Sequence, residues 1–304
     1  VVEGLLGRGG MAAVYVARHT TLGSYHALKV LELNRPSVRE RLVKEGVVQS
    51  KLRHPNVVTV TDSIEVNGQA ALVMEYVHGP SLAALVWDLS QNEEFLSTPQ
   101  VDALAAGLFD GLQAAHALGA VHRDLKPHNI ILQVDGQNVI PKIADFGLVK
   151  VLDDMADSKT RTNMFCGTPE YMSPEQARSA RGVDTRADLF SLGVMLYELV
   201  SGIRPFSGED LVDVVNSVAA GDRRSFRDVA PNAPQRMVDA VEAALVTDRD
   251  LRVQTVAELR AMWFAGEEAG APDWDTEWLL TLVDALPDPA EAIITSAMPE
   301  RRVG

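Results

Sequence analysis

Residues 122–129 read His-Arg-Asp-Leu-Lys-Pro-His-Asn, and the rest of the chain is best interpreted from this stretch outward. It places a carboxylate at Asp124, a mobile cation at Lys126 and an amide oxygen at Asn129 within a few residues. Phosphoryl transfer needs such a set, because a hydroxyl must be oriented, developing charge neutralised and magnesium held against phosphates. The stretch therefore indicates a phosphoryl-transfer site.

A glycine-rich stretch at residues 7–14, Gly-Arg-Gly-Gly-Met-Ala-Ala-Val, would let a backbone approach phosphates closely. Taken alone it also satisfies the dinucleotide-binding pattern, which permits alanine at its last glycine position. That fold requires a helix directly after the glycines, whereas residues 14–18 and 25–31 alternate like two strands joined by a turn. The sequence therefore favours a glycine-rich hairpin that covers a nucleotide.

A second predicted hairpin follows the first stretch, with strands at residues 130–133 and 139–143 and a turn at Asp135-Gly136. A hairpin returns the chain to its own open end, so we expect Asn129 and Asp145 to converge. A carboxylate and an amide oxygen form a hard-oxygen site of the kind that magnesium accepts, completed by water and phosphates.

These stretches, with Asp-Phe-Gly at residues 145–147, resemble the motifs of the protein kinase family in their family order, over residues 1–264. The resemblance implies an α+β fold in two lobes. The small β-rich N-lobe would comprise residues 1–74, the hinge 75–79, and the larger, mostly helical C-lobe 80–264. Gly-Gly-Met at residues 9–11 is typical of the bacterial group of eukaryotic-like (Hanks-type) serine/threonine kinases.

The resemblance also implies the roles of individual residues. Asp124 would orient the substrate hydroxyl or accept its proton. Lys126 would neutralise charge on the transferred phosphoryl group, and a lysine at this position favours serine/threonine substrates. Asn129 and Asp145 would hold Mg²⁺, with Mn²⁺ as an alternative ion. The residues expected to contact ATP are Gly7, Gly9, Gly10, Val14, Ala27, Lys29, Met74, Glu75, Val77 and Ile131.

Lys29 would also pair with a glutamate of a predicted helix at residues 38–52. Glu45 has the family's spacing before His-Pro-Asn at residues 54–56, and Glu40 is the only rival. Gln49 stands one turn later, where the family usually buries an apolar residue. This polar group would favour an inactive position of the helix.

Residues 147–172 would form the family's activation segment, a switch loop. We expect phosphorylation at Thr160 and Thr162, because their distance from Gly-Thr-Pro-Glu-Tyr at residues 167–171 resembles that of bacterial relatives. Arg123 would pair with the phosphate, and Thr168 would help to seat the substrate.

The remaining motifs point to structural roles. Ser-Pro-Glu at residues 173–175 replaces the family's usual Ala-Pro-Glu, and Glu175 would pair with buried Arg252. Asp188 would hold the backbone of the catalytic loop, and His122 would pack as a structural histidine. Further strands are expected at residues 57–60 and 70–74, a loop at 87–99, and helices from Ser81 and at 101–118, 188–199, 211–220, 234–245 and 255–264.

Composition narrows the class of protein. The 304 residues carry a formal net charge of −14, which argues against a general nucleic-acid binder because phosphate backbones are met by clustered Lys and Arg. Cys166 is the only cysteine, so the chain has no internal disulfide and a reducing, cytoplasmic compartment is indicated. The sequence shows no membrane-spanning apolar run. Lacking an initiator Met, the chain is expected to be a fragment, and any anchor would lie outside it.

Residues 265–304 form an acidic tail with a predicted amphipathic helix that begins near Asp275 and stops at Pro287. Its apolar face would pack on the kinase lobe itself, on a partner surface or at an autoregulatory contact. The apolar residues of that face are Trp278, Leu279, Leu282, Val283 and Leu286.

The predicted function is phosphoryl transfer from MgATP to serine and threonine hydroxyls of proteins, switched by phosphorylation of the chain's own loop, with self-association for that step. Three alternatives remain. A scaffolding pseudokinase would lack catalytic groups that this chain keeps, and a small-molecule kinase would lack the intact segment at residues 167–175. A non-catalytic nucleotide sensor would require that Gln49 prevent the pairing of Lys29 with Glu45.

Overall fold

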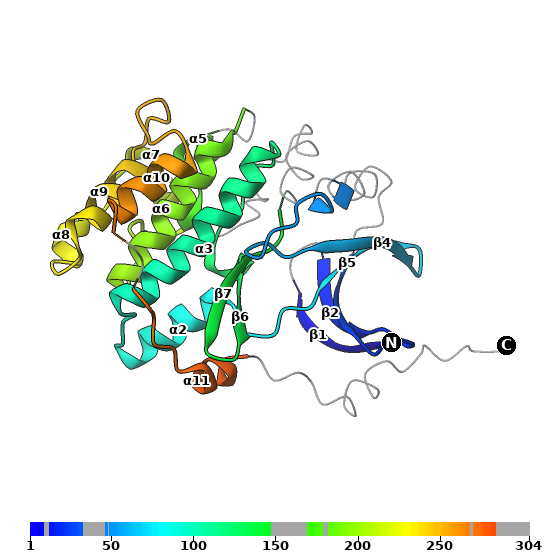
Figure 1. Ribbon diagram of the computed structural model, residues 1–304. Coiled ribbons are helices and arrows are strands. Elements are labelled where there is room, and N and C mark those ends of the chain that lie inside the picture. Colours follow the sequence, from blue (N-terminus) through cyan, green and yellow to red (C-terminus); the bar gives the residue numbers. More distant parts are fainter. Residues whose placement is uncertain are drawn as a thin grey trace. The chain divides into compact units, whose positions relative to one another are not determined.

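A computed structural model describes residues 1–8, 12–32, 46–47, 49–146, 169–178, 182–267 and 270–283. The described residues group into two compact units. The N-terminal unit draws on residues 1–50 and 59–77, and the C-terminal unit on residues 51–58 and 78–282. The first is built around a sheet and the second mainly from helices, which confirms the expected α+β class (Figure 1).

The N-terminal unit contains an antiparallel sheet with the strand order β1-β2-β3-β5-β4. Asn67 and Gly68, at φ 50° and 81°, form the expected turn between β4 and β5. One face of the sheet is packed around Leu28, Val30 and Ala71. Its strands are β1 (Val2–Arg8), β2 (Ala12–Arg18), β3 (Tyr25–Leu31), β4 (Val60–Val66) and β5 (Gln69–Glu75).

The strand expected at residues 57–60 was placed too early, because β4 begins only at Val60. Val57 belongs to the C-terminal unit, where it forms a parallel bridge with Ile143 and is 2% exposed. The bridge uses hydrogen bonds from Ile143 N to Asn56 O and from Val58 N to Ile143 O, each 2.9 Å long. The apolar run at residues 57–60 is thus divided. Val57 pairs with Ile143, whereas Val60 is the first residue of β4.

The C-terminal unit is built around α6 (Thr185–Ser201), nearly all of whose residues are buried. Helices α3 (Thr98–Ala117) and α9 (Gln235–Ala244) pack against it, and α10 (Val256–Phe264) packs against both of these. This unit also contains the helices α2 (Leu82–Asn92), α5 (Pro174–Arg178), α7 (Leu211–Ala220) and α8 (Phe226–Val229), and a two-stranded sheet of β6 (Ile130–Asp135) and β7 (Asn138–Ile143).

The loop expected from residue 87 is also corrected, since α2 continues to Asn92. Ser81 caps its N-terminus by accepting the Ala84 N–H at 3.1 Å, and Glu93 ends it at φ 55°. Trp87 is 67% exposed, so the polar, irregular composition reflects the solvent side of a helix. Just before α2 the chain runs beside β6, and a Cβ at Gly79 would lie 1.8 Å from the Leu132 carbonyl oxygen.

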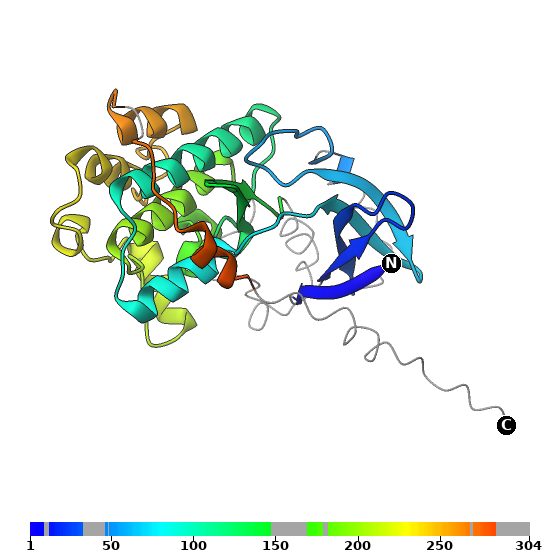
Figure 2. The ribbon, with the colours of Figure 1, turned by 60° about the horizontal axis from the view of Figure 1, so that its bottom comes forward.

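The tail helix forms as α11 (Thr276–Thr281), with Asp275 at its N-cap. Trp274 and Leu279 are buried in the core of the C-terminal unit, so the helix packs on this unit of its own chain, next to β6 (Figure 2). It ends earlier than expected, with Leu282 as its C-cap. Leu286 and Pro287 lie outside the described residues.

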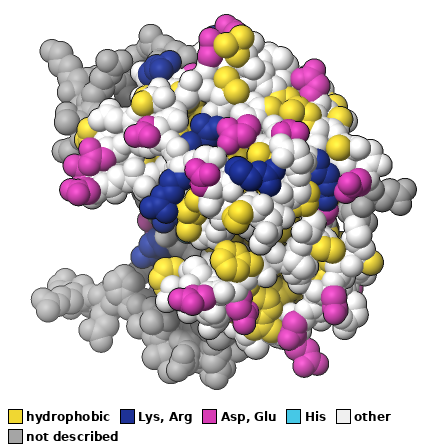
Figure 3. All heavy atoms as spheres, turned by 90° about the vertical axis from the view of Figure 1, so that its left-hand side faces the viewer, with side chains coloured by type: hydrophobic (Ala, Val, Ile, Leu, Met, Phe, Trp, Pro, Cys, Tyr) yellow, Lys and Arg dark blue, Asp and Glu magenta, His cyan; other side chains and the backbone are white. Residues whose placement is uncertain are grey.

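Figure 3 views the molecule from the end at which α8 and α9 lie in Figure 1. Acidic and basic side chains are interspersed on this face, and the apolar side chains form small separate groups. Within the described part of the chain, we find no helix that is both long and apolar enough to span a membrane.

Candidate active site

The loop at residues 122–129 brings together the three groups that the sequence singled out. Lys126 Nζ lies 2.9 Å and 3.1 Å from the two carboxylate oxygens of Asp124. Asn129 Nδ2 donates to the Asp124 carbonyl at 2.7 Å and to its carboxylate at 3.2 Å. A short 3₁₀ turn, Pro127–Asn129, returns the chain so that these side chains meet. The expected grouping is confirmed.

The second hairpin also forms, with Ile130 opposite Ile143 in the register of β6 and β7. Beyond it, Ala144 N donates to Asn129 O at 2.8 Å, which places Asp145 at the open end of the hairpin beside Asn129. Asp145 has φ 64°, a left-handed conformation that few residues with a Cβ adopt. Strained backbone of this kind is concentrated at functional sites.

The residues at this open end fit a magnesium ion. Asn129 is 8% exposed and its amide nitrogen is bound to Asp124, so its oxygen is the side-chain atom that remains to face a cation. Among the described residues, no group of three or more His, Cys, Asp or Glu forms a metal cluster. Two protein oxygens suit Mg²⁺, which retains several waters and binds substrate phosphates directly.

His122 is fully buried and packs as a structural residue, as expected. Its Nε2 donates to the Ala144 carbonyl at 2.8 Å, because a carbonyl oxygen can only accept. Its Nδ1 is then the acceptor for the Asp124 N–H at 3.2 Å. The ring also lies 4.7 Å from that of Phe146, between centroids. His122 therefore links the loop to the end of β7.

Asp188 of α6 holds the loop backbone, which confirms its expected role. Its fully buried carboxylate accepts the N–H groups of His122 and Arg123, both at 2.8 Å. His116 of α3 lies 2.8 Å from the same carboxylate and was missed by the sequence analysis. Its position in the last turn of α3, six residues before His122, is a weak signal, because a helical histidine usually has no such partner.

In the N-terminal unit, Lys29 is 6% exposed and lies between Val14 of β2 and Leu72 of β5 in the sheet register. Ala27 pairs with Met74 in the same way. The predicted residues that fall outside the described part of the chain are Gly9, Gly10, Glu45, Gly147, Thr160, Thr162, Cys166 and Thr168.

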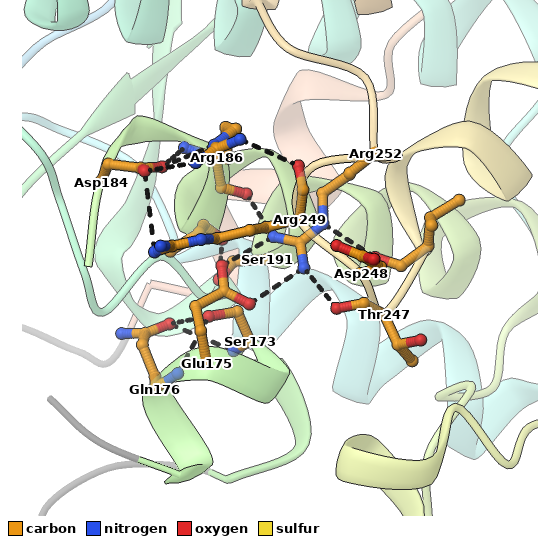
Figure 4. Close-up of polar contacts among 12 residues, drawn as sticks. Ser173, Glu175, Gln176, Asp184, Arg186, Ser191, Thr247, Asp248, Arg249 and Arg252 are labelled. Carbon is orange, nitrogen blue, oxygen red and sulfur yellow. Dashed lines mark hydrogen bonds and ion pairs between the residues drawn. The ribbon is translucent and has the colours of Figure 1, made fainter. Parts of the chain in front are cut away.

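Glu175 forms the expected pair with buried Arg252 (Figure 4). Two nearly parallel hydrogen bonds of 2.8 Å and 2.9 Å join them, and the Arg252 side chain is 0% exposed. Arg252 also donates to the carbonyls of Val246, Arg186 and Thr247. Burial raises the pKa of Glu175, but the hydrogen bonds and charge of Arg252 outweigh it and hold this pKa below its ordinary value.

A groove of about 840 Å³ opens beside the loop, with Pro127 and His128 in its wall. Glu198 lies in it at 7% exposure and accepts the Tyr171 hydroxyl at 2.5 Å. Arg204 pairs with Glu170 at 2.6 Å across the same surface. Burial raises the pKa of both Glu198 and Tyr171. Trp87, Pro205 and Phe206 add apolar surface to the groove.

Comparison with known proteins agrees with this geometry. A family model described as "Protein kinase domain" matches residues 1–264. The probable serine/threonine-protein kinase PknB of Bifidobacterium longum is 32% identical over 280 residues, which cover 88% of this chain and 39% of that protein. Serine/threonine-protein kinase Pkn1 of Myxococcus xanthus is 39% identical over 244 residues, 79% of this chain and 33% of that protein. Serine/threonine-protein kinase PknB of Mycolicibacterium smegmatis is 37% identical over 281 residues, which cover 88% of this chain and 43% of that protein.

The chain therefore belongs to the protein kinase family. Within the family it is a Hanks-type domain of the bacterial group, and the relatives named above are described as serine/threonine-protein kinases. The chain spans less than half the length of these relatives.

Proposed function

We propose that this protein transfers the γ-phosphate of ATP to serine and threonine hydroxyls of other proteins, using the loop at residues 122–129. The observation that carries the proposal is the meeting of Asp124, Lys126 and Asn129 within hydrogen-bond distance. A carboxylate, a cation and an amide oxygen in contact provide for orientation of a nucleophile, charge neutralisation and metal binding.

In this mechanism Asp124 orients the substrate hydroxyl and accepts its proton. Lys126 stabilises the negative charge that develops on the transferred phosphoryl group. Asn129 and Asp145 bind Mg²⁺, or Mn²⁺ in its place; the bound ion would neutralise phosphate charge. Lys29, supported by Glu45, contacts the α- and β-phosphates. The other residues proposed to contact ATP are Gly7, Gly9, Gly10, Val14, Ala27, Met74, Glu75, Val77 and Ile131.

The groove beside the loop supports a protein substrate. It combines apolar surface at Trp87 and Phe206 with the charged groups Glu170, Glu198 and Arg204, which together can contact the mixed side chains of a peptide. Its wall includes Pro127, three residues after Asp124 in the chain, so a peptide in the groove would reach the proposed catalytic loop.

The first test is phosphate transfer by the purified chain. We expect incorporation of labelled phosphate from MgATP into the protein itself and into myelin basic protein. Asp124→Asn and Lys29→Met should each abolish it, since they remove the proposed base and the phosphate contact. Binding of ATP measured by calorimetry should survive in Asp124→Asn. A wild-type chain that binds ATP but transfers no phosphate would instead be a scaffold or a nucleotide sensor.

The proposed regulation is autophosphorylation of Thr160 and Thr162 between two transiently associated copies of the chain. Arg123, next to Asp124, supplies a cation for the resulting phosphates. Phosphopeptide mapping after incubation with MgATP should find phosphate on these threonines. Asp124→Asn mixed with wild type should be phosphorylated at the same sites, in trans. Phosphate found only within residues 265–304 would contradict this regulation.

A further inference from the structure

The peptide group between Arg123 and Asp124 is held in an unusual conformation. Arg123 has φ 67°, in the left-handed region that a residue with a Cβ seldom adopts. Its N–H is fixed by the buried carboxylate of Asp188 at 2.8 Å. Such a conformation persists only where the surroundings over-determine it. The contacts of the next peptide group, formed by the Arg123 carbonyl and the Asp124 N–H, therefore bear directly on the placement of Asp124.

The carbonyl of this peptide group is bound by a residue from a different segment. Gln176 Nε2, in α5, donates to Arg123 O at 2.6 Å. The N–H on the other side of the same planar group is that of Asp124, which donates to His122 Nδ1 at 3.2 Å. With both its oxygen and its hydrogen held, the peptide plane cannot rotate freely. The direction in which the Asp124 side chain leaves the backbone is thereby fixed.

The amide of Gln176 is itself oriented by Ser173. Its Oε1 accepts the Ser173 N–H at 3.1 Å and the Ser173 hydroxyl at 3.0 Å (Figure 4). Because the oxygen is engaged at the start of α5, the amide nitrogen is the end that faces Arg123. The opposite orientation would set an oxygen against a carbonyl oxygen. Ser173 is 0% exposed, so its hydroxyl is committed to this contact.

Helix α5 is a firm support for this contact. Glu175, the residue before Gln176, is joined to Arg252 by two hydrogen bonds, and Arg252 is bound in turn to the Arg186 carbonyl in α6 at 2.7 Å. The helix is therefore anchored to the same element that carries Asp188. Asp188, which binds the Arg123 N–H, and Gln176, which binds the Arg123 carbonyl, are thus both positioned by α6.

We propose that Gln176 is a positioning residue for phosphoryl transfer, and that Ser173 orients it for this role. The inference rests on the proposed catalytic role of Asp124. It assigns a use to the serine at position 173, where the family usually has alanine. The activation segment ends at this point of the chain, so the same contact would pass the position of that segment to the catalytic loop.

The competing explanation is that Ser173 and Gln176 only cap α5, as a Ser-x-x-Gln pair does at many helices. The variant Gln176→Glu distinguishes the positioning role from the capping role, because a glutamate at this position keeps the capping contacts but has no N–H to donate. It also sets a negative oxygen against the Arg123 carbonyl. The cap of α5 should therefore be kept while the turnover of the enzyme falls.

The chain offers a matched control in the same motif. Ser97 and Gln100 cap α3 by the same two contacts, at 2.8 Å and 2.9 Å. Gln100 Nε2 likewise donates to a carbonyl, that of Asp273 at 2.7 Å, which belongs to the segment before α11 and not to the catalytic loop. Gln100→Glu makes the same chemical change without touching the peptide group of Arg123.

The experiment compares the wild type, Gln176→Glu, Gln100→Glu and Ser173→Ala as full chains with myelin basic protein and MgATP. All are first phosphorylated to equal extent by wild-type enzyme, which intact mass measurements verify. Loss of one orienting hydrogen bond should lower kcat about tenfold in Gln176→Glu, with unchanged KM for ATP. Gln100→Glu should keep its kcat. Ser173→Ala should show a smaller fall, of about threefold.

A kcat in Gln176→Glu equal to that of Gln100→Glu would overturn the proposal and leave Gln176 as a cap alone. If Gln176→Glu does not fold, as judged from its melting temperature, an unchanged kcat in Ser173→Ala has the same consequence. Asp124→Asn is measured in parallel. Activity retained by that variant would refute the proposed role of Asp124, an outcome distinct from any result at position 176.

Discussion

At the scale of single residues, the buried guanidinium of Arg252 shows how much depends on one side chain. It makes two hydrogen bonds to Glu175 and three to backbone carbonyls, with no exposed surface. A planar group with five donors in fixed directions suits this task, and a lysine could not reproduce it. The pair was predictable from the motif, but the three carbonyls were not, because they belong to helix α6 and to the segment that follows α9.

Arg252→Met should lower the free energy of unfolding by about 3–5 kcal/mol, because it leaves Glu175 and the carbonyls without their donor. Urea unfolding followed by tryptophan fluorescence measures this loss. Arg249→Met is the control: its ion pair with Asp184 is 3.9 Å long and exposed, so its loss should cost less than about 1 kcal/mol. Equal losses in both variants would contradict a bracing role for Arg252.

The pair of Glu175 and Arg252 makes the free energy of unfolding depend on pH. The folded pKa of Glu175 lies below its unfolded value of 4.5, so its stabilising contribution is fully present above pH 4.5. It is lost as the pH falls through the lower, folded pKa. The difference in unfolding free energy between the wild type and Glu175→Gln should therefore be constant near neutral pH and shrink below pH 4.5.

At the scale of elements, periodicity and capping residues predicted the long helices and the strands of the hairpins. The predicted boundaries were wrong where solvent exposure of a helix, or pairing with a distant segment, determines where an element begins or ends. Helix α2 was cut short in the prediction, because its exposed side resembles a loop in composition. The strand at residues 57–60 was misplaced, since Val57 pairs with Ile143, which is 86 positions later in the chain. Local pattern carries no information on such pairing.

Helix α11 has a specific dependence on packing. Leu279 is 0% exposed in the core of the C-terminal unit, whereas Leu280 is 37% exposed. Leu279→Ala should destabilise the fold by about 2–5 kcal/mol through the cavity that it leaves. Leu280→Ala should change stability by less than about 0.5 kcal/mol. Thermal unfolding of the two variants tests this, and equal melting temperatures would show that α11 does not contribute to the fold.

At the scale of the whole molecule, the folded C-terminal unit extends beyond the matched family domain. The family match ends at residue 264, while packed residues continue to Leu282. Gln100 at the start of α3 donates a hydrogen bond to the Asp273 carbonyl, so the segment after residue 264 contacts the rest of the C-terminal unit through polar as well as apolar groups. Truncation at the family boundary would remove Trp274 and Leu279 from the core.

The sequence by itself determined the family, the loop at residues 122–129 with its carboxylate, cation and amide, and the hairpin that brings Asn129 beside Asp145. These follow from short-range patterns, in which residue type and spacing carry the chemistry. Tertiary structure alone decided that His116 joins Asp188, and that Gln176 binds the Arg123 carbonyl 53 positions away. These contacts arise where side chains of α3, α5 and α6 come together beside the backbone of His122 and Arg123. The physical reason is that a hydrogen bond between distant segments depends on how helices pack, which no local pattern encodes.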